Sequence, residues 1–273
     1  MVSRRRFTDA HTHLDRFAEA DLPEVLAAAR RAGVAWIVTA GMDLPSSQRA
    51  IDLAKEHEGV LASVGFHPWV AADGLPPGAC DALSGLAAQG PVVAIAEVGI
   101  DFVGNAFTGR SYAAAAPRRA QEAALRAQIG VARELGLPLV IHCRGAYEQL
   151  LRILGEERAH RVGGVVHNFD ADLGTAHHLL DLGFLLSFGG AITDPAAGAL
   201  RELVGRLPLD GMLLETDAPY MPLHGEEAAP NEPSRVVRVA RAVAQHAGID
   251  EERLVEATGT NFTRCFRPDE TGA

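Results

Sequence analysis

The chain has 273 residues, of which 48% are hydrophobic, and this composition can fill a sizeable core, which excludes a disordered chain. No apolar run reaches the roughly 18 residues that a membrane-spanning helix needs, so we expect no membrane association of that kind. The formal net charge of -10 argues against non-specific binding to nucleic acid through a basic surface, although bound divalent cations would reverse the sign of the charge locally.

The first residues and the cysteines indicate a cytoplasmic protein. The arginines at 4–6 superficially resemble a twin-arginine export signal, but TDAHTHLDRF follows them in place of the apolar stretch that such a signal requires. Cys80, Cys143 and Cys265 are widely spaced and form no CxxC pair, which is typical of reduced thiols. We therefore expect a cytoplasmic location.

Short apolar runs alternate with longer, alanine-rich segments along the whole chain. Segments such as 117–136 and 195–206 place apolar residues three and four positions apart, which predicts helices. The apolar runs predict eight strands, at 7–11, 34–40, 60–66, 92–99, 138–143, 162–169, 184–188 and 212–217.

This alternation predicts a parallel α/β sheet that is buried on both faces. An open doubly wound sheet would share it, but the count of eight strands and the absence of a Gly-rich loop after the first strand favour a closed TIM-type (β/α)8 barrel. No linker or break in composition divides the chain, so we expect a single domain over residues 1–273. Two long connections, 101–116 and 218–233, are expected to serve function, as long βα loops usually do.

Imidazole and carboxylate groups fall at the predicted C-terminal ends of these strands. In a closed parallel barrel all of these ends face one mouth, so residues remote in sequence converge there. Glu97 lies inside the apolar run VVAIAEVGI, where a carboxylate is costly to bury unless it is paired or binds a cation. The same argument applies to Asp217 in MLLETDAP, although an Asp before Ala-Pro can also shape a turn. The converging set is His11, His13, His67, Glu97, His142, His167 and Asp217.

Six of these side chains are predicted to bind metal. His11 and His13 are two positions apart, so their side chains share one face of a strand and can bind one cation together. The imidazole and carboxylate donors suit ions such as Mg, Mn or Zn. Six ligands are too many for one tetrahedral zinc, so we predict two ions with Glu97 as the bridge. The predicted ligands are His11, His13, Glu97, His142, His167 and Asp217.

Such a site predicts metal-assisted hydrolysis. Two divalent ions lower the pKa of a shared water, which can then attack a phosphorus atom or a carbonyl carbon. Asp217 is the candidate general base, because it would neighbour that water. The remaining histidines are expected at the surface, away from the site, and His67 is expected to contact substrate. The surface set is His57, His160, His177, His178, His224 and His246.

At these residues the sequence resembles the TatD family of metal-dependent hydrolases, within the amidohydrolase-like barrels. The resemblance implies a barrel, divalent cations and hydrolysis, and many members of the family are described as DNases. The segments that carry it cover nearly the whole chain: TDAHTHLD (8–15), SVGFHPW (63–69), AIAEVGID (94–101), LGLPLVIHCR (135–144), VVHNF (165–169), LLETDAPY (213–220) and PNEP (230–233).

The resemblance also implies individual roles. Glu97 would touch both ions. His67 would lie near the substrate, Arg144 would face a substrate phosphate or form a structural salt bridge, and Asn231 would contribute to the rim of the substrate pocket. One ion would be held by His11, His13 and Asp217, and the other by His142 and His167.

Two departures from the family pattern bear on the substrate. The family commonly has Cys-Phe-Ser-Gly after the histidine that matches His167, whereas this chain has the run 168–171, Asn-Phe-Asp-Ala. Ala96 stands where a glycine usually precedes the glutamate. Neither change removes a ligand, but Asp170 would repel a phosphodiester unless the metal ions offset its charge.

Three functions are compatible with the sequence. The first is a phosphodiesterase, most simply a DNase of the 3′-exonuclease type, with DNA or another phosphoester as its partner. The second is an amidohydrolase or esterase that acts on a small molecule or on an acyl-nucleic acid ester, because the same activated water attacks carbonyl groups. The third is a non-enzymatic partner protein with a vestigial site, which the intact set of six ligands argues against.

Overall fold

Eight parallel strands form one sheet in the order β1-β2-β3-β4-β7-β8-β9-β10. The computed structural model describes residues 7–105 and 108–267, so the arginines at 4–6 that entered the prediction about export lie outside the described residues. The alternation of strands and helices confirms the predicted (β/α)8 barrel. The strands are β1 (Phe7–Thr12), β2 (Val34–Ala40), β3 (Val60–Val64), β4 (Val92–Asp101), β7 (Leu139–Arg144), β8 (Gly164–Val166), β9 (Phe184–Phe188) and β10 (Met212–Leu214).

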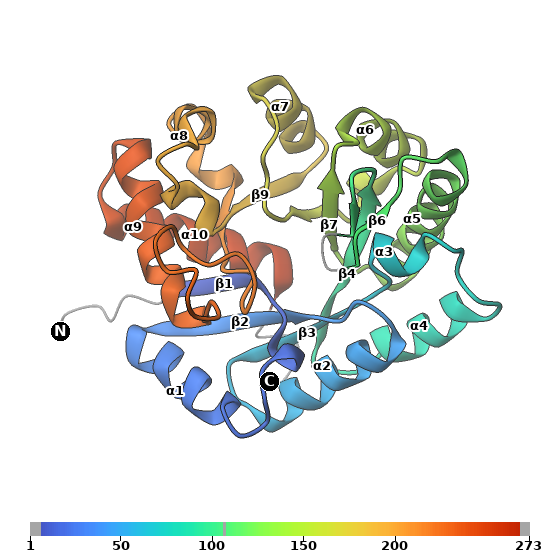
Figure 1. Ribbon diagram of the computed structural model, residues 1–273, viewed down its shortest axis with the longest axis horizontal. Helices are drawn as coiled ribbons and strands as arrows, with labels where there is room; N and C mark the ends of the chain where they lie inside the picture. Colours follow the sequence, from blue (N-terminus) through green and yellow to red (C-terminus); the bar gives the residue numbers. More distant parts are fainter. Residues whose placement is uncertain (1–6, 106–107, 268–273) are drawn as a thin grey trace.

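The outer helices succeed one another around the sheet in chain order, from α1 to α9 (Figure 1). No helix in the described part of the chain is long and apolar enough to cross a membrane. The α-helices are α1 (Leu22–Ala32), α2 (Leu44–Glu56), α3 (Pro68–Ala71), α4 (Ala79–Ala87), α5 (Ala115–Leu135), α6 (Tyr147–Glu156), α7 (Leu173–Asp181), α8 (Gly198–Val204), α9 (Val236–Ala247) and α10 (Glu251–Phe266). Short 3-10 helices are η1 (Leu14–Arg16), η2 (Ala159–Arg161), η3 (Gly190–Thr193), η4 (Leu209–Gly211) and η5 (Pro233–Arg235).

Local sequence chemistry sets where these helices begin and end. The side chain of Asp43 accepts a hydrogen bond from the backbone N–H of Ser46, and the Ser46 hydroxyl accepts one from Asp43, which together cap the start of α2. Helix α5 ends at Leu135 and is capped by Gly136, whose φ of 67° is the left-handed conformation that glycine adopts at low cost. The predicted helices at 117–136 and 195–206 correspond to α5 and α8, which differ from the prediction by a few residues at their ends.

Three strands end earlier than predicted, and this affects where the polar side chains lie. Strands β3, β8 and β10 end at Val64, Val166 and Leu214, two to three residues before the predicted ends at 66, 169 and 217. Asn168 follows β8 and Asp217 follows β10, and both have left-handed backbones, with φ of 46° and 59°. This conformation is incompatible with an extended strand. The polar groups after these strands therefore belong to loops at the barrel mouth.

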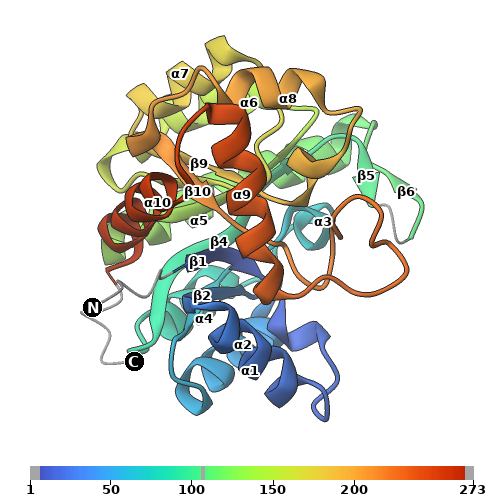
Figure 2. The same ribbon diagram turned by 90° about the vertical axis from the view of Figure 1, so that its left-hand side faces the viewer.

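The core has two layers, one between the strands and the helices and one inside the barrel. Small and branched side chains such as Ala10, Ala94 and Val140 fill the inside. Phe262 and Phe266 of α10 join this inner cluster, and α10 packs on β1 and β10 (Figure 2). The two rings therefore close the end of the barrel opposite the mouth.

The barrel closes between its first and last strands. The backbone N–H of Asp217 donates to the carbonyl of His11 at 2.9 Å, and the N–H of His13 donates to the carbonyl of Ala218 at 2.7 Å. These bonds join the end of β1 to the chain that follows β10. The junction between the first and last strands, which we call the seam, is therefore closed at the mouth.

The two long connections both lie beside the mouth and differ in structure. The first, 101–116, contains a small antiparallel hairpin that the sequence did not predict, made of β5 (Gly104–Asn105) and β6 (Arg110–Ser111), with residues 106–107 outside the description. The second, 218–233, contains no helix or strand before η5 (Pro233–Arg235) among the described residues.

We predict that Phe262→Ala destabilises the fold by about 3–5 kcal/mol, the usual cost of removing a buried aromatic ring. The Phe262 side chain is fully buried inside the barrel. The measurement is the free energy of unfolding in urea. The neighbouring exposed residue Thr263 supplies the control, because Thr263→Ala should change this free energy by less than about 0.5 kcal/mol. Equal effects of the two substitutions would contradict the assignment of Phe262 to the barrel interior.

Candidate metal centre

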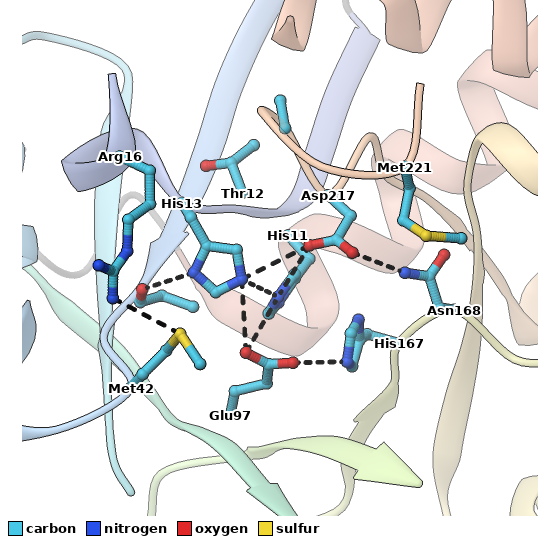
Figure 3. Close-up of polar contacts among 12 residues, drawn as sticks. His11, Thr12, His13, Arg16, Met42, Glu97, His167, Asn168, Asp217 and Met221 are labelled. Carbon is cyan, nitrogen blue, oxygen red and sulfur yellow. Dashed lines mark hydrogen bonds and ion pairs between the residues drawn. The ribbon is translucent and has the colours of Figure 1, made fainter. Parts of the chain in front are cut away.

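The structure brings the predicted acidic and imidazole side chains together at one mouth of the barrel. Some lie within β1, β4 and β7, and the others lie one to three residues after the ends of β1, β3, β8 and β10. Figure 3 shows Glu97 and Asp217 facing His11 and His13, with His167 on the other side of Glu97. The cluster is almost entirely shielded from solvent, since five of the six predicted ligands are buried and His142 is nearly so.

Glu97 lies at the centre and directs one oxygen to each half of the cluster. Its Oε1 is 2.9 Å from Nε2 of His167 and 3.1 Å from Nδ1 of His142. Its Oε2 is 3.4 Å from Nε2 of His13 and 3.7 Å from Nε2 of His11. The carboxylate therefore joins two sets of imidazole nitrogens.

Asp217 completes the half of the cluster that contains the two histidines of β1. Its Oδ1 is 3.5 Å from Nε2 of His13 and 3.8 Å from Nε2 of His11, and the two imidazole nitrogens are 3.3 Å apart. The donor atoms of these three residues lie within 4.8 Å of one another, close enough to surround one ion.

Close backbone contact brings β4 and β7 together at the cluster. Gly99 pairs with His142 across the two strands and has a φ of 155°. A Cβ atom at Gly99 would lie 1.8 Å from the carbonyl oxygen of His142, so only glycine fits there. This contact lies two residues after Glu97 in β4 and keeps Glu97 and His142 on adjacent strands.

Three of the histidines present their second ring nitrogen to an acceptor behind the cluster. Nδ1 of His13 is 3.2 Å from the carbonyl oxygen of Ala40. Nε2 of His142 is 3.5 Å from Oδ2 of Asp101, and Nδ1 of His167 is 3.6 Å from Oε1 of Glu215. An acceptor on the outer nitrogen favours the tautomer in which that nitrogen carries the proton, and the inner nitrogen then has a free lone pair.

The surroundings of the cluster favour an ionised glutamate and shift the imidazoles in opposite directions. Burial favours the neutral form of Glu97, but the imidazoles of His67, His167 and His11 outweigh it and hold the pKa of this carboxyl well below its usual value. Burial, reinforced by the neighbouring His167, lowers the pKa of His11 well below its usual value. Burial disfavours the charged ring of His167, but Glu97 and Glu215 outweigh it and hold the pKa of this ring well above its usual value. At His13 burial is likewise outweighed by Asp217 and Glu97, which raise the pKa of this ring. An ionised carboxylate and a neutral imidazole are the states in which both groups bind a cation.

His67 differs from the other members of the cluster in its hydrogen bonds. Its Nδ1 accepts a hydrogen bond from the backbone N–H of Trp69 at 3.1 Å, so its proton lies on Nε2, which is 3.4 Å from Oε1 of Glu97. Burial lowers its pKa to about 4. A neutral ring with its inner nitrogen protonated is a hydrogen-bond donor, and in this structure the donor faces Glu97, so contact of His67 with a substrate stays a prediction.

A cavity of about 650 Å³ opens from the cluster to solvent. Arg16 and Arg144 line it, together with apolar side chains such as Phe169 and Phe188. The Arg144 guanidinium is exposed and donates to the carbonyl of Gly104 at 3.4 Å, and it makes no salt bridge to an acidic group among the described residues.

Asn231 lies behind the cavity wall. It is fully buried, and its Nδ2 donates to the carbonyl of Thr216 at 2.8 Å and to that of Met221 at 3.0 Å. The amide is occupied by the backbone that it holds, so Asn231 does not itself face the cavity. Asn231 instead shapes the rim by fixing the loop after β10.

Four polar residues around the cluster were not singled out from the sequence. Asp101 and Glu215 lie behind His142 and His167, as described above, and Asn168 donates to Asp217. Asp9 is fully buried, and its carboxylate accepts from the backbone N–H of Thr216 at 2.9 Å and from the Thr216 hydroxyl at 2.6 Å. Asp9 and Glu215 each stand two positions before a predicted ligand. In a strand this spacing places both side chains on one face, and it could have identified these two residues from the sequence.

The two departures from the family pattern are both accommodated. Asp170 is exposed at the cavity wall and accepts a hydrogen bond from the hydroxyl of Tyr147 at 2.9 Å. The methyl group of Ala96 packs in the inner cluster of the barrel.

The six histidines expected away from the site lie outside the cavity lining, and two of them are half-buried rather than exposed: His57 and His246.

Comparisons with known proteins agree with this geometry. The family model described as TatD related DNase matches residues 8–267. The chain is 35% identical to the uncharacterized metal-dependent hydrolase YabD of Bacillus subtilis over 260 residues, which cover 95% of this chain and 98% of that protein. It is 34% identical to the 3'-5' ssDNA/RNA exonuclease TatD of Klebsiella pneumoniae over 259 residues, with coverage of 92% and 94%. Among solved structures, the TatD homolog YJJV of Escherichia coli superposes with a TM-score of 0.87 at 30% identity, covering 96% of this chain and 98% of that chain.

We predict that Asp9→Ala lowers the free energy of unfolding by about 3 kcal/mol, because two buried donors of Thr216 lose their acceptor. Asp9→Asn keeps an acceptor oxygen at the same place and should cost about 1 kcal/mol. Urea unfolding of the two variants and the unsubstituted protein measures the difference. If alanine and asparagine were equally harmful, the hydrogen bonds to Thr216 would not be the cause.

Proposed function

Because this chain belongs to the family of TatD-related DNases and is a metal-dependent hydrolase, we propose that it cleaves phosphodiester bonds in single-stranded nucleic acid, as an exonuclease that works from the 3′ end. A relative of similar length is named a 3'-5' ssDNA/RNA exonuclease. The observation that carries the proposal is the Glu97 carboxylate, with one oxygen directed to each of two sets of imidazole nitrogens.

The donor set fits two divalent cations. Oε2 of Glu97 is buried and has no hydrogen-bond partner among the described residues, which is costly unless a cation occupies the space in front of it. Nδ1 of His142 and Nε2 of His167 are 3.1 Å apart, and the outer nitrogen of each ring faces a carboxylate. Two lone pairs at that distance repel each other, and a shared cation relieves the repulsion.

We assign the ligands accordingly. Glu97 would hold both ions, because each of its oxygens faces one set of imidazole nitrogens. His11 and His13 belong with Asp217 because their donor atoms form one compact group. The first ion would be held by His11, His13 and Asp217, and the second by His142 and His167. The mixture of imidazole and carboxylate donors suits Mg, Mn or Zn.

The residues around the cluster would then perform the hydrolysis. Bound divalent cations lower the pKa of a water molecule and polarise the phosphoryl group. The Asp217 carboxylate stands beside the cluster and would take the proton of the attacking water as general base. His67 would donate the hydrogen on its Nε2 to a substrate oxygen, and the exposed Arg144 would bind a neighbouring phosphate.

The cavity favours a strand end over a duplex. A space of about 650 Å³ lined by the partly exposed rings of Trp69 and Tyr220 offers aromatic faces for stacking of unpaired bases. The catalytic cluster is buried at its floor, so a base-paired helix would be held away from it. The same apolar lining also suits an acyl group, which is why an esterase or amidohydrolase is the second candidate.

We predict that the protein, stripped of metal by chelation, regains cleavage of a labelled single-stranded oligonucleotide on addition of Mg, Mn or Zn. Glu97→Gln and Asp217→Asn should each lower this rate on the order of a thousandfold, because they remove the bridge and the base. Substitution of the exposed His177 by alanine is the matched control and should leave the rate unchanged. Labels at the 5′ and 3′ ends report the polarity of digestion.

Hydrolysis of aminoacyl esters, lactones or amides, with no cleavage of the oligonucleotide under any of the three metals, would contradict the nuclease proposal and favour the second candidate. If an Asp217 variant lost both activities but still performed the cellular role of the protein, the third function, a non-enzymatic partner protein with a vestigial site, would be supported instead.

We further predict that Asp101→Asn weakens binding of Mn²⁺ about 10–100-fold, the usual effect of removing a carboxylate behind a metal-binding histidine. Oδ2 of Asp101 lies 3.5 Å from Nε2 of His142, and an amide nitrogen in its place could not accept the proton that this nitrogen carries. A calorimetric titration of the metal-free protein with Mn²⁺ gives the Kd. Asp73→Asn is the control, because Asp73 is exposed and forms an ion pair with Arg110 away from the cluster. The Kd of this variant for Mn²⁺ should equal that of the unsubstituted protein.

A further inference from the structure

Asn168 lies between the two halves of the cluster and is bonded to a carboxylate of each. Its side-chain Nδ2 donates to Oδ2 of Asp217 at 3.0 Å (Figure 3). Its backbone N–H donates to Oε1 of Glu215 at 2.7 Å, and this same oxygen is 3.6 Å from Nδ1 of His167. The side chain thus serves Asp217, whereas the backbone serves the carboxylate behind His167.

The bond to Asn168 makes the two oxygens of Asp217 unequal. Oδ2 is engaged by the amide, and Oδ1 is the oxygen that faces Nε2 of His11 and His13. The terminal torsion of an aspartate is otherwise broad, so a carboxylate without such a bond samples many orientations. The amide therefore holds the carboxylate in the orientation that directs a single oxygen into the cluster.

The surroundings of Asn168 are fitted to an amide at this position. Its φ of 46° is left-handed, a conformation in which asparagine is more common than most residues. Gly189 lies against the side chain, where a Cβ atom would come within 2.9 Å of Oδ1 of Asn168. An aspartate of the same size would place a second negative charge beside Asp217.

We infer that Asn168 is a positioning residue, whose side-chain amide orients Asp217 so that Oδ1 is the oxygen that this carboxylate would offer to a cation. This inference rests on the proposed metal site. It separates the two roles of one residue, because only the side chain acts on the cation beside Asp217, and only the backbone acts on the half that contains His167.

The separation can be tested with Asn168→Gly, which removes the amide, tolerates the left-handed backbone and keeps the backbone N–H. Arg158→Gly is the matched control, since Arg158 is also left-handed, with a φ of 53°, and is exposed away from the cavity. Metal-free protein is titrated with Mn²⁺ by calorimetry, and the Tm of the metal-free protein is recorded.

We expect two binding phases in the unsubstituted protein and in Arg158→Gly. In Asn168→Gly the Kd of one phase should rise about 10–100-fold while the other phase and the metal-free Tm stay unchanged. Asn168→Ala is a second variant that removes the amide and should weaken the same phase.

Unchanged affinity in both phases would overturn the inference. An equal loss in both phases, or a lower metal-free Tm with no selective loss, would also overturn it by showing that Asn168 only supports the loop. If the unsubstituted protein binds Mn²⁺ but does not cleave an oligonucleotide, the proposed nuclease function fails, whereas the Mn²⁺ titration still decides the role of Asn168.

Discussion

The carboxylate of Asp9 binds the backbone and hydroxyl of Thr216 across a sequence separation of 207 residues, and this bond lies at the seam on which the whole site depends. Beside it, backbone hydrogen bonds join His11 to Asp217 and His13 to Ala218. The seam brings two imidazoles from the first strand against a carboxylate that follows the last one. A barrel that failed to close here would keep its other strands in order but would separate the proposed ligands of one cation.

The six predicted metal ligands could be located from sequence because a parallel barrel sends all of its strand ends to one mouth. Strand alternation identified the ends, and the presence of Glu97 within an apolar run indicated that something must compensate its charge. The prediction therefore rested on topology together with the cost of burying a carboxylate, and neither requires knowledge of side-chain orientation.

Other features of the site could not be obtained in this way. Strands β8 and β10 end early because Asn168 and Asp217 adopt left-handed backbones, which an apolar run does not reveal. Which acceptor groups lie near the outer ring nitrogens depends on the separation of side chains from different strands. Asn231 was expected at the rim of the substrate pocket because its segment resembles a family motif, but the motif does not show whether its amide faces the cavity or the backbone behind it.

The two rings that α10 places inside the barrel have a consequence for how the protein is made. Phe262 and Phe266 are among the last described residues to leave the ribosome, yet they belong to the same apolar cluster as Ala10 and Val38 near the start. Until they arrive, the nascent strands surround an unfilled, hydrophobic opening. Early contacts of the emerging chain should therefore be those of the outer helices with the sheet, and a chaperone would meet the open end of the barrel in the interval between the emergence of β10 and that of α10.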